Sequence, residues 1–152
     1  MEETLSSIFT RTKGTPINLN GQTVVAIIEI KITKPRTVFS IRRLSATNGR
    51  VQGLVLKAVS GQIVVDGSGY PEIVLWSDTS PDAAEIEVLS KSGSTLKIWN
   101  VWKSNSGMSA WVGNAGVQVS WPDGKMTLEC SDGVGDVDFS DYVVAFEEQQ
   151  FG

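Results

Sequence analysis

The chain of 152 residues contains no histidine. This absence excludes Ser-His-Asp and Cys-His nucleophilic machinery, imidazole general bases and histidine-ligated zinc. A single cysteine, Cys130, also excludes an internal disulfide bond and a cysteine-rich metal site. Aspartate and glutamate are numerous enough to supply the carboxylate pair of a glycoside hydrolase, but nothing in the sequence singles out a pair. We therefore expect that the protein is not an enzyme.

Long apolar runs are lacking too, because charged residues interrupt every such run within about ten residues, well short of a transmembrane helix. The first residues, MEETLSSIFTRTKGTPINLN, carry acids where a secretory signal carries bases. They also have no long apolar core. The expectation is a protein without a targeting signal, most simply cytoplasmic, with leaderless export left open.

Helical periodicity is scarce, whereas short apolar or alternating segments recur between turn residues. These segments are 22–32, 37–44, 51–59, 62–66, 72–76, 84–89, 95–103, 117–121, 125–130 and 142–146. Nine or ten short strands predict an all-β fold, a single-domain antiparallel β-sandwich that is jelly-roll-like or immunoglobulin-like, with a closed barrel as the alternative. We expect residues 1–20 to form a flexible N-terminal arm and residues 21–152 to form the β-sandwich domain.

Charge is divided unevenly along the chain. Residues 1–60 carry nine Lys/Arg and three Asp/Glu, which gives a net charge of +6. Residues 61–152 carry four Lys/Arg and fourteen Asp/Glu, which gives a net charge of −10. The division fits either head-to-tail self-association or compensation within one fold, and compensation is favoured because a sandwich interleaves its two halves. The basic stretch KPRTVFSIRRL falls short of a domain-wide basic surface, so we expect no nucleic-acid partner.

All five tryptophans fall between residues 76 and 121, at positions 76, 99, 102, 111 and 121. Strand alternation predicts that Trp102 and Trp121 face the core, whereas Trp99 lies on the outer face and is partly exposed. Trp111 lies in a glycine-rich loop from which its ring can project. Exposed indole rings beside amide groups are typical of sugar-binding surfaces, so Trp99, Trp111 and Asn114 are the candidate ligand-binding residues. The same rings also suit a protein–protein contact or a site covered by the N-terminal arm.

The segment CSDGVGDVDFSDYVVAF combines a core-facing Cys130 with a connection rich in acids. Its four aspartates, Asp132, Asp136, Asp138 and Asp141, offer the oxygen ligands that Ca²⁺ prefers, although their spacing does not match an EF-hand. Aspartate and glycine are also common turn residues, and Asx-turns require no metal. The interpretation as turns is favoured, and a Ca²⁺ site at these four residues is the alternative.

Two stretches carry a resemblance to known proteins. GDVDFSDYVV resembles the G-D-x-D-F-x-D-[LY]-V ending of several bacterial β-sandwich domains, some of them in calcium-associated surface proteins, and WVGNAGVQV is similar to a part of small bacterial proteins of unknown function. The similar portion covers about residues 95–147. The resemblance implies a β-sandwich with the acidic loop near its tip and no enzymatic activity. Val137 and Ser140 stand where more acidic versions have Asp or Asn, which reduces the implied calcium ligand set.

Three hypotheses for function follow. The leading one is a non-catalytic, lectin-like module that binds carbohydrate through Trp99, Trp111 and Asn114. The second is a self-assembling structural or interaction protein that forms a homo-oligomer. The third and weakest is a membrane-surface-binding or pore-forming sandwich protein. The N-terminal stretch MEETLSSIFTR is too short and too weakly amphipathic to serve as its membrane-binding segment.

Overall fold

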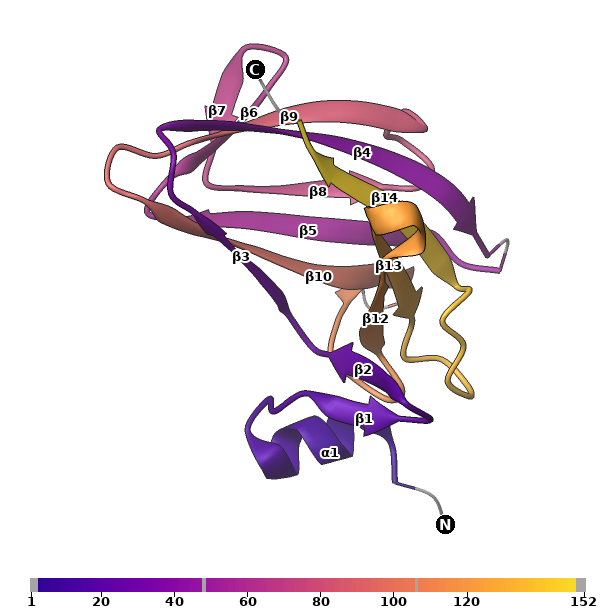
Figure 1. Ribbon diagram of the computed structural model, residues 1–152. Coiled ribbons are helices and arrows are strands. Elements are labelled where there is room, and N and C mark those ends of the chain that lie inside the picture. Colours follow the sequence, from indigo (N-terminus) through magenta and orange to yellow (C-terminus); the bar gives the residue numbers. More distant parts are fainter. Residues whose placement is uncertain (1–2, 48, 106, 150–152) are drawn as a thin grey trace.

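The described part of the protein forms an antiparallel β-sandwich of two sheets with one α-helix (Figure 1). The structure, a computed structural model, describes residues 3–47, 49–105 and 107–149. The first sheet has the strand order β1 (Ile17–Leu19), β2 (Gln22–Val25), β12 (Gly116–Ser120), β13 (Met126–Ser131), β14 (Tyr142–Glu148), β4 (Arg36–Ala46), β9 (Ala83–Leu89), β6 (Gln62–Val65) and β7 (Ser68–Tyr70).

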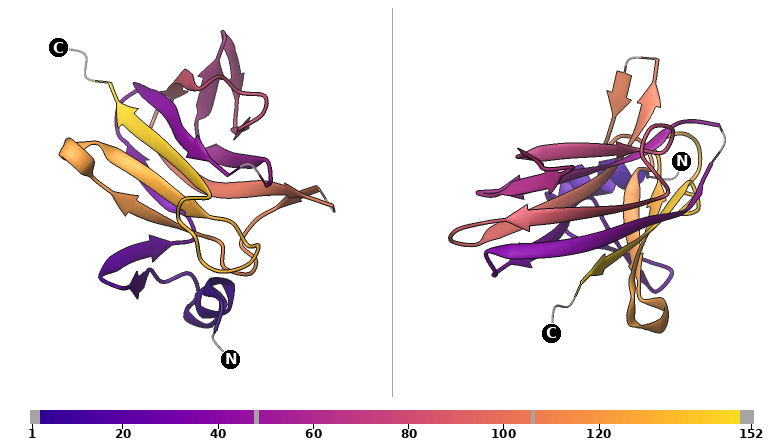
Figure 2. Two further views of the ribbon diagram at one scale, coloured as in Figure 1. Left: turned by 90° about the vertical axis from the view of Figure 1, so that its right-hand side faces the viewer. Right: turned by 90° about the horizontal axis from the view of Figure 1, so that it is seen from above.

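The second sheet is built around the long strand β10 (Ser94–Ser104). β10 pairs on one side with β5 (Gln52–Val59), which pairs in turn with β8 (Glu72–Trp76). It also pairs with β3 (Ile28–Ile32) and with the short β11 (Gly107–Ser109). Seen from the side, β12, β13 and β14 lie in front of the strands of the second sheet (Figure 2).

The main core lies between the two sheets and takes its side chains from both. Phe39 and Phe146 of the first sheet pack with ring centroids 4.9 Å apart, and Leu56 and Ile98 of the second sheet belong to the same cluster. Burial of these side chains is the main stabilising contribution to the fold. The predicted all-β sandwich is therefore confirmed, and Cys130 and Trp102 are buried as expected.

The described residues hold fourteen strands, more than the nine or ten that we expected. The predicted strand 22–32 accounts for part of the difference, because it divides into β2 and β3, which join different sheets. The remaining additions, β1, β7 and β11, are only three residues long. Strands of this length pair in hairpins but leave little alternation for a sequence pattern to detect.

Residues 3–20, which we assigned to a flexible arm, contain helix α1 (Leu5–Thr12) and strand β1. The Thr4 hydroxyl accepts a hydrogen bond from the Ser7 N–H at 3.2 Å and caps the helix. Leu5 and Phe9, one turn apart on the same helix face, are buried in a second small core with Val24. An eight-residue helix is too short to give a clear periodic signal in sequence.

The uneven charge distribution is compensated within the fold. Four ion pairs join a cation from residues 1–60 to an acid from residues 61–152. They are Lys34–Glu148, Arg36–Glu87, Arg43–Asp82 and Arg50–Asp132. The antiparallel topology accounts for the pairs along β4, because this strand lies between β14 and β9 and brings early and late residues together. The pair Arg50–Asp132 joins two loops instead.

A 3-10 turn, η1 (Pro122–Gly124), connects β12 and β13. Among the described residues, no helix has the length and the apolar character needed to cross a membrane.

Candidate functional site

The two candidate tryptophans Trp99 and Trp111 form a pair. Their ring centroids lie 5.0 Å apart at an interplanar angle of 34°. Trp99 lies on the outer face of β10, as its alternation indicated, but only 9% of its surface is exposed, so the expected partial exposure of its ring is wrong. Trp111 covers it from the loop, and Trp99 also packs against Val55 and Val101 on the same sheet face. Trp99 is therefore held inside a small outer core.

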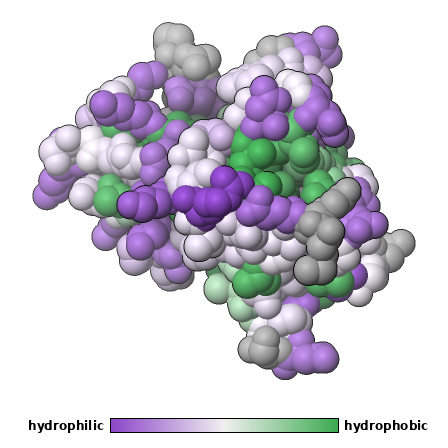
Figure 3. All heavy atoms as spheres, turned by 90° about the horizontal axis from the view of Figure 1, so that it is seen from below, coloured by the Kyte–Doolittle hydropathy of each residue, from purple (hydrophilic) through white to green (hydrophobic). Residues whose placement is uncertain are grey.

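Trp111 projects partly into solvent, as expected, with 45% of its surface exposed. Its backbone is left-handed, with φ 56°, and its indole N–H donates a hydrogen bond to the Ala26 carbonyl at 3.2 Å. One side of the Trp111 ring therefore packs against Trp99, and its N–H is bound to Ala26. The exposed part of the ring borders a shallow groove of about 250 Å³ beside α1. α1 belongs to the lower end of the molecule, where hydrophobic side chains gather among hydrophilic ones (Figure 3).

Asn114, the third candidate, uses its side-chain amide to hold two segments of the protein together. Its Oδ1 accepts a hydrogen bond from the Leu5 N–H at 3.2 Å, and its Nδ2 donates one to the Gly135 carbonyl at 2.8 Å. The Ser6 N–H adds a third bond, to the Gly113 carbonyl at 2.9 Å. Asn114 therefore joins the beginning of α1 to the acidic loop, a role that its sequence position did not indicate.

Two glycines allow the loop of Trp111 and the acidic loop to touch. A Cβ atom at Gly113 would lie 2.2 Å from the Gly133 carbonyl oxygen, and one at Gly133 would lie 2.6 Å from the Trp102 ring. Both distances are well below van der Waals contact, so neither position has room for a side chain. The close approach places Val112 and Val134, both exposed, on neighbouring loops at this end of the sandwich.

The acidic loop does not bring its four carboxylates together. Asp132 is fully buried, and its Oδ2 accepts hydrogen bonds from Arg50 Nε at 2.7 Å and from Gln52 Nε2 at 2.9 Å. Its Oδ1 accepts from the Val134 N–H at 2.9 Å. The hydrogen bond that Arg50 donates to the carboxylate of Asp132 raises the pKa of Arg50. A cation from the protein itself thus already neutralises this aspartate.

The other three aspartates differ from one another in exposure and in hydrogen-bond partners. Asp138 Oδ1 accepts hydrogen bonds from the backbone N–H and hydroxyl of Ser140, which lower its pKa, as in an Asx-turn. Asp141 Oδ2 accepts from the Asp132 N–H at 3.1 Å, and burial raises the pKa of Asp141. Asp136 is exposed.

Within the described ranges, no group of three or more Cys, Asp or Glu residues is arranged to hold a metal ion. Calcium binding by Asp132, Asp136, Asp138 and Asp141 stays a prediction, and the ion pair of Asp132 with Arg50 argues against that ligand set.

A different tryptophan, Trp121, lines a groove that is rich in aromatic side chains. Trp121, expected in the core, has 63% of its surface exposed. The expectation is wrong because β12 ends at Ser120, and the backbone of Trp121 turns toward Pro122 with ψ 61°. Alternation between the two faces of a sheet holds only while the strand continues.

The Trp121 groove has a volume of about 450 Å³ and lies at the margin between the two sheets. Its lining includes Phe39 and Phe146 of the first sheet and Ile30 of the second. Its polar lining residues are Lys125, Glu147 and Glu148. Lys125 and Glu147 are exposed, whereas Glu148 forms an ion pair with Lys34, in which Oε2 and Nζ lie 3.8 Å apart. The groove therefore combines an exposed indole with carboxylates and an ammonium group.

The fold and these contacts define the protein as a small antiparallel β-sandwich with aromatic grooves. Comparison of the chain with protein-family models, with curated proteins and with solved structures finds no match.

Proposed function

We propose that the protein is a non-catalytic carbohydrate-binding module whose ligand lies in the Trp121 groove. The observation that carries the proposal is the exposure of the Trp121 indole, 63%, beside Glu147 and Lys125. A flat indole face stacks on the C–H groups of a pyranose ring, while carboxylate and ammonium groups bind its hydroxyls. A volume of about 450 Å³ is within the range of small-ligand sites.

The proposed binding site differs from the one that the sequence suggested, at Trp99, Trp111 and Asn114. Trp99 is buried beneath Trp111, and the amide of Asn114 is engaged by Leu5 and Gly135. A sugar at that position has to compete with bonds that hold α1 in place. The Trp121 groove requires no such rearrangement.

Tryptophan fluorescence titrated with a panel of neutral and acidic oligosaccharides tests the proposal. We expect at least one glycan to change the emission, and we expect both Trp121→Ala and Glu147→Gln to abolish or strongly weaken binding. Trp111→Ala is the matched control, because it removes an exposed indole outside the groove. If no glycan in the panel binds, or if Trp121→Ala binds like the wild type, the proposal is wrong.

A second candidate function is self-association through β8. This strand ends the second sheet, and its residues Ile73 to Trp76 are only half-buried. An edge strand presents backbone groups that can pair with a second chain. Size-exclusion chromatography with light scattering tests the candidate, with Val74→Lys expected to convert an oligomer into a monomer. A strict monomer at all protein concentrations contradicts it.

A further inference from the structure

The end of the sandwich where β3 turns into β4, β5 into β6 and β9 into β10 carries two grooves. One has a volume of about 430 Å³ and the other about 550 Å³. Ser60 and Ser92 line both, so the grooves meet at the β9–β10 turn. We call this region the hydroxyl-rich end, after the six serine and threonine residues that line it: Thr33, Ser60, Ser90, Ser92, Ser94 and Thr95.

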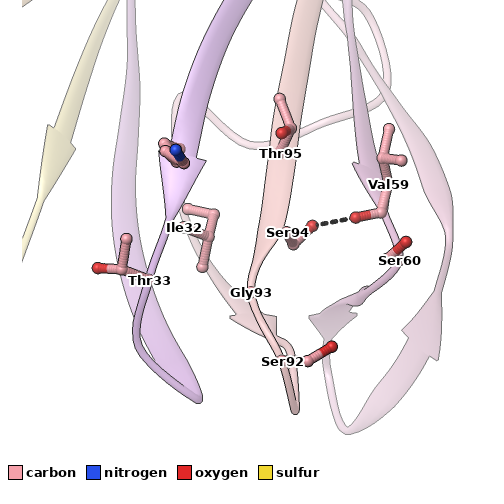
Figure 4. Close-up of a pocket in the computed structure, with 9 residues that line it drawn as sticks. Ile32, Thr33, Val59, Ser60, Ser92, Gly93, Ser94 and Thr95 are labelled. Carbon is pink, nitrogen blue, oxygen red and sulfur yellow. Dashed lines mark hydrogen bonds between the residues drawn. The ribbon is translucent and has the colours of Figure 1, made fainter.

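Figure 4 shows the first of these grooves. The Ser94 hydroxyl donates a hydrogen bond to the Val59 carbonyl at 2.5 Å, which ties β10 to the end of β5. Ser60 and Ser92 lie on neighbouring loops that line the groove, and Ser60 has a left-handed backbone, with φ 63°. The structure gives the hydroxyls of Ser60 and Ser92 no hydrogen bond to another described residue, so they are free to donate to a ligand.

Ser90 lines the second groove and is the most informative residue of the region. It is 6% exposed, and its Oγ is buried without a hydrogen-bond partner among the described residues. Its backbone N–H donates to the Pro35 carbonyl at 3.0 Å, which holds the residue in place. Buried hydroxyls normally have a partner, because an unsatisfied one carries the full cost of its desolvation. A ligand in the groove supplies such a partner.

The charges lining both grooves are of one sign. Lys31 lines the first groove and Lys91 the second, and no aspartate or glutamate lines either. The Trp121 groove, in contrast, includes Glu147 and Glu148. A neutral sugar is normally bound by a mixture of donors and acceptors, whereas ammonium groups and hydroxyls without carboxylates favour a ligand that only accepts hydrogen bonds.

We propose that the hydroxyl-rich end binds a tetrahedral oxyanion, a sulfate or phosphate group, between Lys31, Lys91 and the serine hydroxyls. The ammonium groups neutralise its charge, and the hydroxyls of Ser60, Ser90 and Ser92 donate to its oxygens. The site shares no residue with the Trp121 groove, so the two proposals stand or fall separately.

The test is calorimetric titration of the full chain with sodium sulfate and with sodium phosphate, compared with sodium chloride at matched ionic strength. NMR of the backbone amides locates any bound anion. We expect binding of at least one oxyanion, with shifts at residues 31–33, 60–62 and 90–95. Lys31→Met and Lys91→Met each weaken binding by about tenfold, the loss of one charge-assisted hydrogen bond. Lys13→Met, at the end of α1, is the matched control and leaves the affinity unchanged.

Ser90→Ala distinguishes a ligand-binding hydroxyl from a structural one. It removes an unsatisfied buried group, so we expect the variant to be as stable as the wild type or more stable, while its affinity for the oxyanion falls several-fold. A structural hydroxyl gives the opposite result, with lower stability and unchanged affinity.

Two further arms identify the source of the oxyanion. One uses a sulfated oligosaccharide, and the other uses phosphatidylcholine vesicles with and without phosphatidic acid. Binding in either arm that depends on Lys31 and Lys91 supports the proposal and names the source, and binding of the inorganic ions alone indicates a free anion. Sulfate and phosphate titrations identical to chloride, or unchanged affinity in both lysine variants, overturn it.

Discussion

The fully buried carboxylate of Asp132 and the guanidinium of Arg50 form an ion pair, with Nε and Oδ2 2.7 Å apart. The pair joins the acidic loop to the connection between β4 and β5, two segments 82 positions apart in the sequence. Gln52, also fully buried, donates to the same carboxylate oxygen at 2.9 Å. The acidic loop is therefore held by a cation that belongs to the protein.

The first prediction concerns this pair. Asp132→Ala should lower the free energy of unfolding by about 3 kcal/mol, because it leaves the Arg50 and Gln52 donors without their shared acceptor. Urea denaturation measures the change. Asp136→Ala is the matched control in the same loop, and since Asp136 is exposed we expect a change within about 0.5 kcal/mol. Equal effects of the two substitutions contradict the structural role of Asp132.

The same loop yields a prediction about calcium. Because Arg50 already neutralises Asp132, we expect neither Ca²⁺ nor EDTA to move the melting temperature of the wild type. A ligand that binds the native state at a hundred times its Kd adds about 2.7 kcal/mol, which a thermal melt detects readily. A rise in melting temperature with Ca²⁺ that Asp136→Ala abolishes restores the calcium hypothesis.

The third prediction is a pH dependence that comes from Asp141. Burial raises the pKa of Asp141, and the carboxylates of Asp132 and Asp138 raise it further, against the N–H of Asp132 and the charge of Arg50. The folded state therefore holds the proton more tightly than the unfolded state, in which an aspartate has a pKa of about 3.9. The stabilisation is complete below that value and is lost as the pH rises through the folded pKa.

Asp141→Asn removes this titration and keeps an acceptor for the Asp132 N–H. We expect the stability of the variant, relative to the wild type, to increase as the pH rises from about 4 to about 7. Urea denaturation at a series of pH values measures the difference. A difference that is constant with pH, or that falls as the pH rises, shows that Asp141 does not titrate in this way.

The fourth prediction concerns the hydrogen bonds between Asn114 and the N-terminal helix. Asn114→Ala leaves the Leu5 N–H and the Gly135 carbonyl without their partner, so we expect a loss of about 1–2 kcal/mol. Hydrogen exchange should show faster exchange throughout α1. Asn18→Ala is a suitable control, because the Asn18 side chain accepts its hydrogen bond locally, from the Gly21 N–H of the same turn. If α1 exchanges at the same rate in both variants, Asn114 does not hold the helix.

The fifth prediction uses the tryptophan pair as a spectroscopic reporter. Trp111→Ala uncovers Trp99, so we expect the emission to shift to longer wavelength and the protein to lose about 1 kcal/mol beyond the loss of buried area. Trp121→Ala should have the opposite spectral effect, because it removes an indole that is already exposed. A shift to shorter wavelength in Trp111→Ala contradicts the packing of Trp111 over Trp99.

The sequence predicted which side chains of a strand are buried wherever this depends only on residues adjacent in the chain. In residues 84–89, Ile86 and Val88 are buried, as their alternation with Glu85 and Glu87 indicated. A side chain in a strand points to one of two faces, so the pattern needs no knowledge of the partner strand. The all-β class and the buried Cys130 follow from this local information, whereas the exposure of Trp111 was expected from its place in a glycine-rich loop.

The candidate site was predictable only in part, because the exposure of a side chain depends on which other segments of the protein pack over it. The prediction that Trp99 lies on the outer face of the sheet was correct. The side chain that covers it, Trp111, comes from a loop whose position only the tertiary structure gives. Trp121 became exposed because β12 ends one residue earlier than the alternation suggested.

The sequence alone therefore determined the class of fold, the absence of histidine chemistry and the faces of the longer strands, since these depend on composition and on adjacent residues. The tertiary structure decided which charges pair, which tryptophan is free and where polar groups converge. Arg50 meets Asp132 and Leu5 meets Asn114 across separations of 82 and 109 residues. No local pattern encodes such contacts, because they arise only when the two sheets pack and bring distant loops together.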